Sequence, residues 1–378
     1  MDKLKTFTHS QGFVSFLASL FSILCGLVFG YLLLLVFNSD MAAYGMRQML
    51  TSGVSSSSKF AKVLYQSAPL MMTGLSVGFA FKTGLFNIGA TGQYTVGAAG
   101  ALIAGIVFQM PWWACLIAAM VGGAIWGFFP GFFKAMFNVN EVLTSIMFNW
   151  IALFFVNLIF ANIPSTLANY WGDSQTDRTA NLAKANPDAI IPKVGLDKFM
   201  DSNYMNISIF IAILFAILMF IIISKTTFGY ELRACGLNRD ASLYAGINAK
   251  RNIVLSMVIS GALAGVGGAI YYLAGTGQYT LVKALLDMGF NGIPVALLAT
   301  SNPLATIFSA LFISYIQVGG DAMQPEFAKE TIDIIIAVII YLAAFSLLMR
   351  TVIINVFTRK KQKAAAGAEE ASEEEVSE

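Results

Sequence analysis

Long apolar stretches alternate with short charged ones along almost the whole chain. At about 1.5 Å per residue, roughly 20 apolar residues cross the hydrocarbon core of a bilayer as a helix. Measured against that length, the intervals between charged side chains predict about ten transmembrane helices. The predicted fold class is therefore an all-α integral membrane protein.

The predicted spans differ in length and in how they end. They cover residues 14–37, 63–81, two helices within 83–133, 141–162, 207–223, 252–274, two short pieces within 288–319, and 334–354. Gln109, Pro111 and the two tryptophans that follow predict the turn inside 83–133. The Ser301-Asn302-Pro303 sequence predicts the break inside 288–319.

The longer polar segments predict how the chain is organised around the membrane. Residues 163–206 hold several prolines and aspartates and are expected to form an outer loop, whereas the charged residues 225–251 keep helical periodicity and are expected inside. Basic residues favour cytoplasmic N and C termini. The predicted domains are a membrane domain over residues 1–358 and a disordered, charged cytoplasmic tail over 359–378.

Composition agrees with a membrane protein and excludes several kinds of chemistry. Hydrophobic residues make up 57% of the 378 and charged residues 12%, with a mean hydropathy of +0.72. The single histidine, His9, leaves no imidazole catalysis, and Cys25, Cys115 and Cys235 are too far apart to indicate a metal site. No GxxxxGK[ST] phosphate loop occurs, and the net charge of +2 does not favour nucleic acid. We expect neither an enzyme nor a metal or cofactor.

One pentapeptide occurs twice. TGQYT stands at residues 91–95 and again at 276–280, about half the chain length apart. In the predicted topology the two copies follow turns on opposite sides of the membrane, as an inverted repeat would require. The sequence therefore allows an inverted repeat of two halves.

Several polar residues fall within or beside the predicted spans, where polar groups are costly. They are Asn87, Gln93, Glu141, Asn149, Asn157, Gln278, Asp287 and Asn291. Glu141 would be favourable in the first turn of a helix, so capping alone explains it. Asn149 and Asn157 follow it at eight-residue steps along one helix face, which suits either a polar path or a seam of hydrogen bonds between helices.

Glycines recur at four-residue spacing in several spans. They are Gly74 and Gly78, Gly123 with Gly127 and Gly131, and Gly261 with Gly265. Small residues at this spacing allow two helices to approach closely in lipid. We predict that these glycines serve helix packing.

Five stretches together resemble a known family. They are GLFNIGATGQY at 84–94, NEVLTSIMFNWIAL at 140–153, FGYELRACGLNRDASLYAGIN at 228–248, ISGALAGVGGAIYYL at 259–273 and GFNGIPVALLATSNPLATIFSALF at 289–312. They resemble permease subunits of bacterial ABC importers, in the family that includes ribose, branched-chain amino acid and nucleoside permeases. The resemblance covers roughly residues 60–350, and the RACGLN run looks most like nucleoside permeases.

The resemblance implies a function, a location and a set of partners. The chain would be a multi-pass subunit of the bacterial cell membrane that moves nucleosides by alternating access, driven by a separate ATPase. Its partners would be ATP-binding subunits, a second permease that is identical or homologous, and an extracellular substrate-binding lipoprotein. A permease for a simple sugar such as ribose is the nearest alternative, followed by an ion-coupled secondary carrier and a scaffold that only recruits a partner.

The resemblance and the polar residues together give two sets of candidate site residues. The substrate-path candidates are Asn87, Gln93, Glu141, Asn149, Gln278 and Asn291. The resemblance implies that the loop with Glu231, Arg233, Gly236, Asn238 and Arg239 couples the permease to its ATPase. The chain departs from related permeases at Thr91, where an acidic residue is common, and at Pro294, where a small residue is usual.

Overall fold

The computed structural model describes residues 11–344, so the predicted tail at 359–378 lies outside the described residues. The described residues form two compact units, residues 11–46 with 323–344 and residues 47–322. In the first unit, α2 (Gln11–Phe37) packs against α17 (Lys329–Ala344). The helix α3 (Ala42–Thr51) leads from the first unit into the second.

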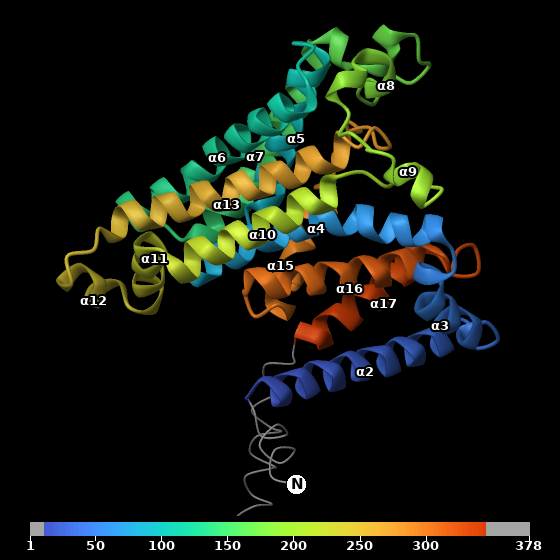
Figure 1. Ribbon diagram of the computed structural model, residues 1–378, viewed down its shortest axis with the longest axis horizontal. Helices are drawn as coiled ribbons and strands as arrows, with labels where there is room; N and C mark the ends of the chain where they lie inside the picture. Colours follow the sequence, from blue (N-terminus) through green and yellow to red (C-terminus); the bar gives the residue numbers. More distant parts are fainter. Residues whose placement is uncertain (1–10, 345–378) are drawn as a thin grey trace, which may run out of the picture. The chain divides into compact units, whose positions relative to one another are not determined.

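The second unit contains the long helices of the bundle. They are α4 (Ser57–Lys82), α5 (Ala90–Ile106), α6 (Trp112–Phe137), α7 (Glu141–Asn162), α10 (Ser208–Lys225), α13 (Ala249–Tyr272) and α16 (Pro303–Asp321). Shorter helices connect them: α11 (Thr227–Leu237), α12 (Arg239–Tyr244), α14 (Asp287–Phe290) and α15 (Gly292–Leu298). Figure 1 shows α11 and α12 at one end of this unit and α8 (Leu182–Ala185) at the other.

The structure is all-helical and multi-pass. Among the described residues, five helices are long and apolar enough to cross a membrane, namely α6, α7, α10, α13 and α16. The prediction of about ten transmembrane helices goes beyond this finding, which identifies five among the described residues. The helix α5 has 17 residues, and α4 begins with the polar sequence Ser-Ser-Lys, so neither has the uniform apolar length of the other five.

The middle of the second unit is built on α13. This helix packs against α4, α5 and most extensively against α6. Gly123 and Gly127 of α6 lie against the backbone of Gly261 and Gly265 of α13, in the space that a Cβ atom would occupy. The prediction that the spaced glycines serve packing is confirmed for these four, because without side chains the two helices gain close van der Waals contact.

The helix ends follow from local side chains. The Asn140 carboxamide accepts hydrogen bonds from the backbone of Val142 and Leu143 and so caps α7. The predicted turn before α6 is confirmed: Gln109 has a φ of 52° and Pro111 is the residue before the helix. The predicted break at 301–303 is also confirmed, because Ser301 has a φ of 54° and Pro303 starts α16.

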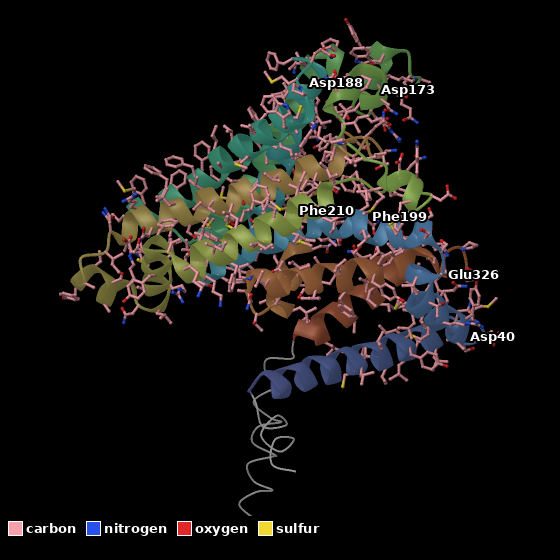
Figure 2. The ribbon with its side chains drawn as sticks, in the orientation of Figure 1. Asp40, Asp173, Asp188, Phe199, Phe210 and Glu326 are labelled. Atoms are coloured by element: carbon pink, nitrogen blue, oxygen red, sulfur yellow. The ribbon has the colours of Figure 1, made fainter. Side chains whose placement is uncertain are left out.

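Residues 163–206 cover one end of the second unit, which we call the loop end; the opposite end is the α11–α12 end. The segment contains only short helices, among them α8 and α9 (Leu196–Phe199). The Asn186 amide donates to the backbone oxygens of Gly105 and Met110, at 2.9 and 3.0 Å, and ties the segment to the turn before α6. Asp173, Asp188 and Phe199 stand on this segment in Figure 2.

The two TGQYT copies have different structures. Residues 91–95 form the first turns of α5, whereas residues 276–280 are irregular. The backbone of the second copy bonds instead to the loop-end segment, where the Thr179 amide donates to the Tyr279 oxygen at 2.9 Å. The pentapeptide therefore marks no pair of equivalent positions, because different tertiary partners fix each copy.

Candidate functional site

Four side chains form a buried polar network between α4, α5 and α13. The Asn87 amide donates to Gln93 Oε1 and to Ser260 Oγ, both at 2.7 Å. Ser260 in turn donates to the backbone oxygen of Ser76 at 2.7 Å, and its hydroxyl lies 2.9 Å from the Ser76 hydroxyl. All four residues are fully buried. The structure thus brings the two predicted residues Asn87 and Gln93 together, with partners on two other helices.

Asn149 connects α7 to the start of α5. Its Oδ1 accepts from the Gly92 amide at 2.8 Å, and its Nδ2 donates to the Ile88 oxygen at 3.1 Å. The side chain therefore caps a helix of another part of the chain. Next to it, the hydroxyl of Thr91 is buried with no hydrogen-bond partner in the described part of the chain. Thr91 is also one of the two positions, with Pro294, at which we expect the sequence to depart from related permeases.

Glu141 lies at the start of α7 and forms an ion pair. Its carboxylate is 2.9 Å from the Lys134 ammonium near the end of α6. Both side chains are mostly buried, and the carboxylate is in the first turn of the helix, where the helix dipole favours it. The geometry supports the structural explanation of Glu141.

A largely non-helical stretch runs from the loop end into the bundle and ends with the short helix α14; we call residues 281–291 the re-entrant segment. Asn157 of α7 holds its start: Nδ2 donates to the Val282 oxygen at 2.9 Å, and Oδ1 accepts from the Tyr279 hydroxyl at 3.1 Å. Burial raises the pKa of Tyr279, so this hydroxyl stays protonated and able to donate. Both Asn149 and Asn157 thus form hydrogen bonds between parts of the chain, as the seam interpretation predicts.

The last two path candidates are Gln278, just before the re-entrant segment, and Asn291, its last residue. Gln278 donates to the Thr179 oxygen at 2.9 Å and belongs to the loop end. Asn291 is half-exposed at the end of α14, and its side chain makes no hydrogen bond within the described residues. The six path candidates therefore do not meet in one place.

Sequence reasoning missed the hydroxyl partners of the buried network. Ser76 and Ser260 lie inside apolar spans, where a serine looks like one more small packing residue. Asn157 and Asp287 stood among the weighed polar residues but not among the path candidates. One signal could have found the serines: an unpartnered polar group in a membrane helix is costly, so a serine there needs a hydrogen-bond partner.

The predicted amphipathic segment forms α11 and α12. Glu231 accepts from the Asn252 amide of α13 at 3.2 Å, and Gly236 packs against the backbone of Gly84 in the turn before α5. The Asn238 side chain caps α12 by accepting from the Ala241 amide. These members of the predicted coupling set hold the segment to the bundle.

The remaining members lie nearer the surface. Arg233 is exposed, and Arg239 donates to the Asn138 carboxamide at 3.5 Å. Large apolar side chains also stand free of the bundle: Leu237 is 89% and Tyr244 is 95% exposed. A short helix pair with free apolar and cationic side chains offers a surface for a protein partner.

No group of three or more potential metal ligands occurs in the residues that the structure describes. The polar sites found in the described residues are amides, hydroxyls and ion pairs that connect helices. This arrangement can bind and guide a solute, but it contains no set of groups for covalent chemistry.

Comparison with known proteins identifies the family. Residues 60–344 match the family described as branched-chain amino acid transport system / permease component. The chain belongs to this permease family. The permease is 37% identical over 343 residues to the guanosine ABC transporter permease protein NupP of Bacillus subtilis, covering 89% of this chain and 95% of the relative. It is a non-catalytic subunit of an ABC transporter of the bacterial membrane.

Two other relatives show the range of the similarity. The permease is 35% identical to the nucleoside ABC transporter permease protein NupB of Lactococcus lactis, over 89% of this chain and 93% of the relative. It is 28% identical to the glucose ABC transporter permease protein TsgB13 of Haloferax volcanii, over 84% of both chains. No solved structure matches the permease.

Proposed function

We propose that the permease carries nucleosides into the cell as part of an ATP-driven importer. The observation that carries this proposal is similarity across about nine-tenths of the chain to permeases named for guanosine and for nucleosides. The chemistry of the bundle supports it, because amides and hydroxyls can both donate to and accept from the many polar groups of a neutral solute. The interior network of Asn87 and Gln93 is of this kind.

The path candidates divide into two roles in this proposal. Asn291 and Gln278 lie nearer the surface and contact the solute. Asn87, Gln93 and Asn149 are bonded to protein in this conformation and exchange these bonds when the permease switches between its two access states. Glu141 fixes the α6–α7 turn beside the path through its ion pair with Lys134.

The ATPase contacts the α11–α12 end, which places that end in the cytoplasm. Arg233 and the free side chains of Leu237 and Tyr244 form the docking surface, and Glu231, Gly236, Asn238 and Arg239 transmit movement to the bundle. The loop end is then outside and receives the substrate-binding lipoprotein. Phe199, which is 85% exposed beside Asp197 and Lys198, suits such a contact.

The remaining assembly follows from the same orientation. About ten spans with cytoplasmic N and C termini, one membrane domain over 1–358 and a second permease complete the importer. The substrate alternative is a simple sugar, which the similarity to a glucose permease favours at lower identity.

Uptake of labelled guanosine and other nucleosides, with ribose as competitor, tests the proposal. We expect uptake to fall on deletion of the permease gene and again on deletion of the ATPase gene. Uptake that ribose abolishes would assign the permease to sugars. Uptake that survives without the ATPase would assign it to ion-coupled carriers.

Charge reversal at Arg233 tests the coupling surface. Arg233→Glu should lower solute-stimulated ATP hydrolysis by about tenfold while the permease stays inserted, because a charge at a protein interface governs association with its partner. Lys250→Glu is the matched control, an exposed charge reversal at the same end of the bundle. Equal ATP hydrolysis by both variants would remove Arg233 from the surface.

A further inference from the structure

Two charged side chains of the re-entrant segment have no partner in the described part of the chain. Lys283 and Asp287 are both exposed. The ion pairs found among the described residues are Lys62 with Asp321, Lys134 with Glu141 and Arg178 with Asp177. Neither Lys283 nor Asp287 makes a side-chain hydrogen bond within these residues. Opposite charges thus stand four positions apart on one exposed stretch.

Packing contacts place this stretch at membrane depth. Val282 bonds to Asn157, which lies five residues before the end of α7, or about 7 Å below it at 1.5 Å per residue. Further along, Gly289 packs on Thr91, which is fifteen residues and so about 22 Å from the loop end of α5. Lys283 follows Val282 directly, and Asp287 precedes Gly289 by two residues. Both charges therefore lie between the level of Asn157 and the level of Thr91, within the depth that the long helices span.

The opposite end of the bundle gives the same depth. The backbone of Gly292 packs directly against Thr73 of α4. Thr73 is nine residues before Lys82, which puts Gly292 about 14 Å above the α11–α12 end of that helix. The re-entrant segment therefore ends near the midplane of a bilayer whose core is about 30 Å thick.

A lipid environment is incompatible with this arrangement. A charged side chain near the bilayer centre costs about 3 kcal/mol or more, and irregular backbone at that depth occurs only where protein covers it or where it lines a water-filled cavity. The neighbouring face of α7 carries the side chains that lipid requires, such as Leu158, which is 62% exposed. This apolar face can contact lipid, whereas the charged stretch needs water or protein around it.

We propose that Lys283 and Asp287 line the water-filled translocation path and contact the solute there. This inference rests on the proposed function. The two opposite charges leave the stretch neutral, which suits an uncharged solute. The Asp287 carboxylate accepts hydrogen bonds from sugar hydroxyls or base N–H groups, and the Lys283 ammonium donates to base carbonyl and ring nitrogen acceptors. Asn157 is the positioning residue, because it holds the start of the stretch through Val282.

Accessibility of introduced cysteines tests the path in the assembled transporter. The parent variant carries Cys25→Ser and Cys235→Ser and keeps Cys115, which is buried. Lys283→Cys and Asp287→Cys are each exposed in cells to a membrane-impermeant, positively charged thiol reagent. Leu158→Cys is the control for the apolar face, and Tyr170→Cys, on the loop-end segment and 63% exposed, is the control for a surface position.

We expect Lys283→Cys and Asp287→Cys to react at least about tenfold faster than Leu158→Cys, since a charged reagent reaches only positions in contact with water. Saturating guanosine should slow both reactions. Labelling at the rate of Leu158→Cys, with Tyr170→Cys fully labelled, would overturn the path and assign the charges to a protein contact. Reaction without protection by guanosine, in cells that take guanosine up, would overturn the solute contact.

The same measurements separate this inference from the proposed function. If nucleoside uptake fails but both cysteines react and a sugar protects them, the path is retained and the substrate assignment is wrong. Asp287→Asn and Lys283→Gln add a readout without cysteine. Each should raise the half-saturating solute concentration by about tenfold with unchanged protein levels, as expected on losing one charge-assisted hydrogen bond.

Discussion

The α6–α13 contact and the re-entrant segment lie in the same bundle but are stabilised in opposite ways. Gly123 and Gly127 meet Gly261 and Gly265 backbone to backbone, and both helices satisfy their own polar groups internally. The start of the re-entrant segment lacks this internal satisfaction, so Asn157 supplies a donor for the Val282 oxygen, and it also accepts from the Tyr279 hydroxyl just before the segment. A helix contact in a membrane needs small residues, whereas an irregular segment needs polar side chains from its neighbours.

The largest expected effect comes from adding one methyl group to the glycine contact. Gly261→Ala should lower the free energy of unfolding by about 1–3 kcal/mol, because the new Cβ would meet the Gly123 backbone, which cannot rotate away. Thermal unfolding of the purified permease in detergent measures this change.

Gly78→Ala is the matched control for Gly261→Ala. A Cβ at Gly78 would lie 3.5 Å from Ser301 Cα, which is an ordinary van der Waals contact. This variant should be neutral or slightly stabilising, because alanine favours the helix by up to about 1 kcal/mol over glycine. Equal unfolding temperatures for the two alanine variants would contradict the tight α6–α13 contact.

A smaller effect on stability is expected at the re-entrant segment. Asn157→Leu removes two hydrogen bonds, each worth about 0.6 kcal/mol on average in a membrane protein. Solute uptake should fall more than stability does, because the loosened segment carries the proposed path residues. Uptake measured beside protein level checks this, with Leu158→Ala as the control for the apolar face. Normal uptake by Asn157→Leu would remove Asn157 as the positioning residue.

The smallest effect is expected at the ion pair beside the glycine contact. Lys134 and Glu141 connect the end of α6 to the start of α7, and their side chains are 24% and 15% exposed. A double-mutant cycle with Lys134→Met and Glu141→Gln should give a coupling free energy of about 1 kcal/mol or less, because part of each side chain remains exposed to solvent, which screens the pair. A coupling free energy larger than the loss of unfolding free energy in Gly261→Ala would contradict this order of effects.

Much of the helix pattern could be predicted from the sequence. The span at 141–162 has the observed bounds of α7, and the break at Ser301-Asn302-Pro303 separates α15 from α16. These features depend on nearby residues, namely apolar length, a capping asparagine and a proline. The predicted span begins at residue 63, whereas α4 begins at Ser57, because the charge of Lys62 limits the apolar stretch on which the prediction rests.

The candidate sites could be predicted only in part. Asn87 and Gln93 are only six positions apart, but Ser260 is 173 positions from Asn87, and no local pattern indicates that Asn87 and Ser260 are bonded. The two TGQYT copies show the same limit, since identical residues form a helix in one place and an irregular stretch in the other.

The sequence by itself determined that this protein is a helical membrane protein with glycine-packed spans, because apolar length and residue spacing act locally along the chain. Only the tertiary structure decided which polar residues are bonded and which stand free. Hydrogen bonds and depth in the bilayer depend on neighbours distant in the chain, which is why Glu141 is paired while Lys283 and Asp287 have no partner in the described residues.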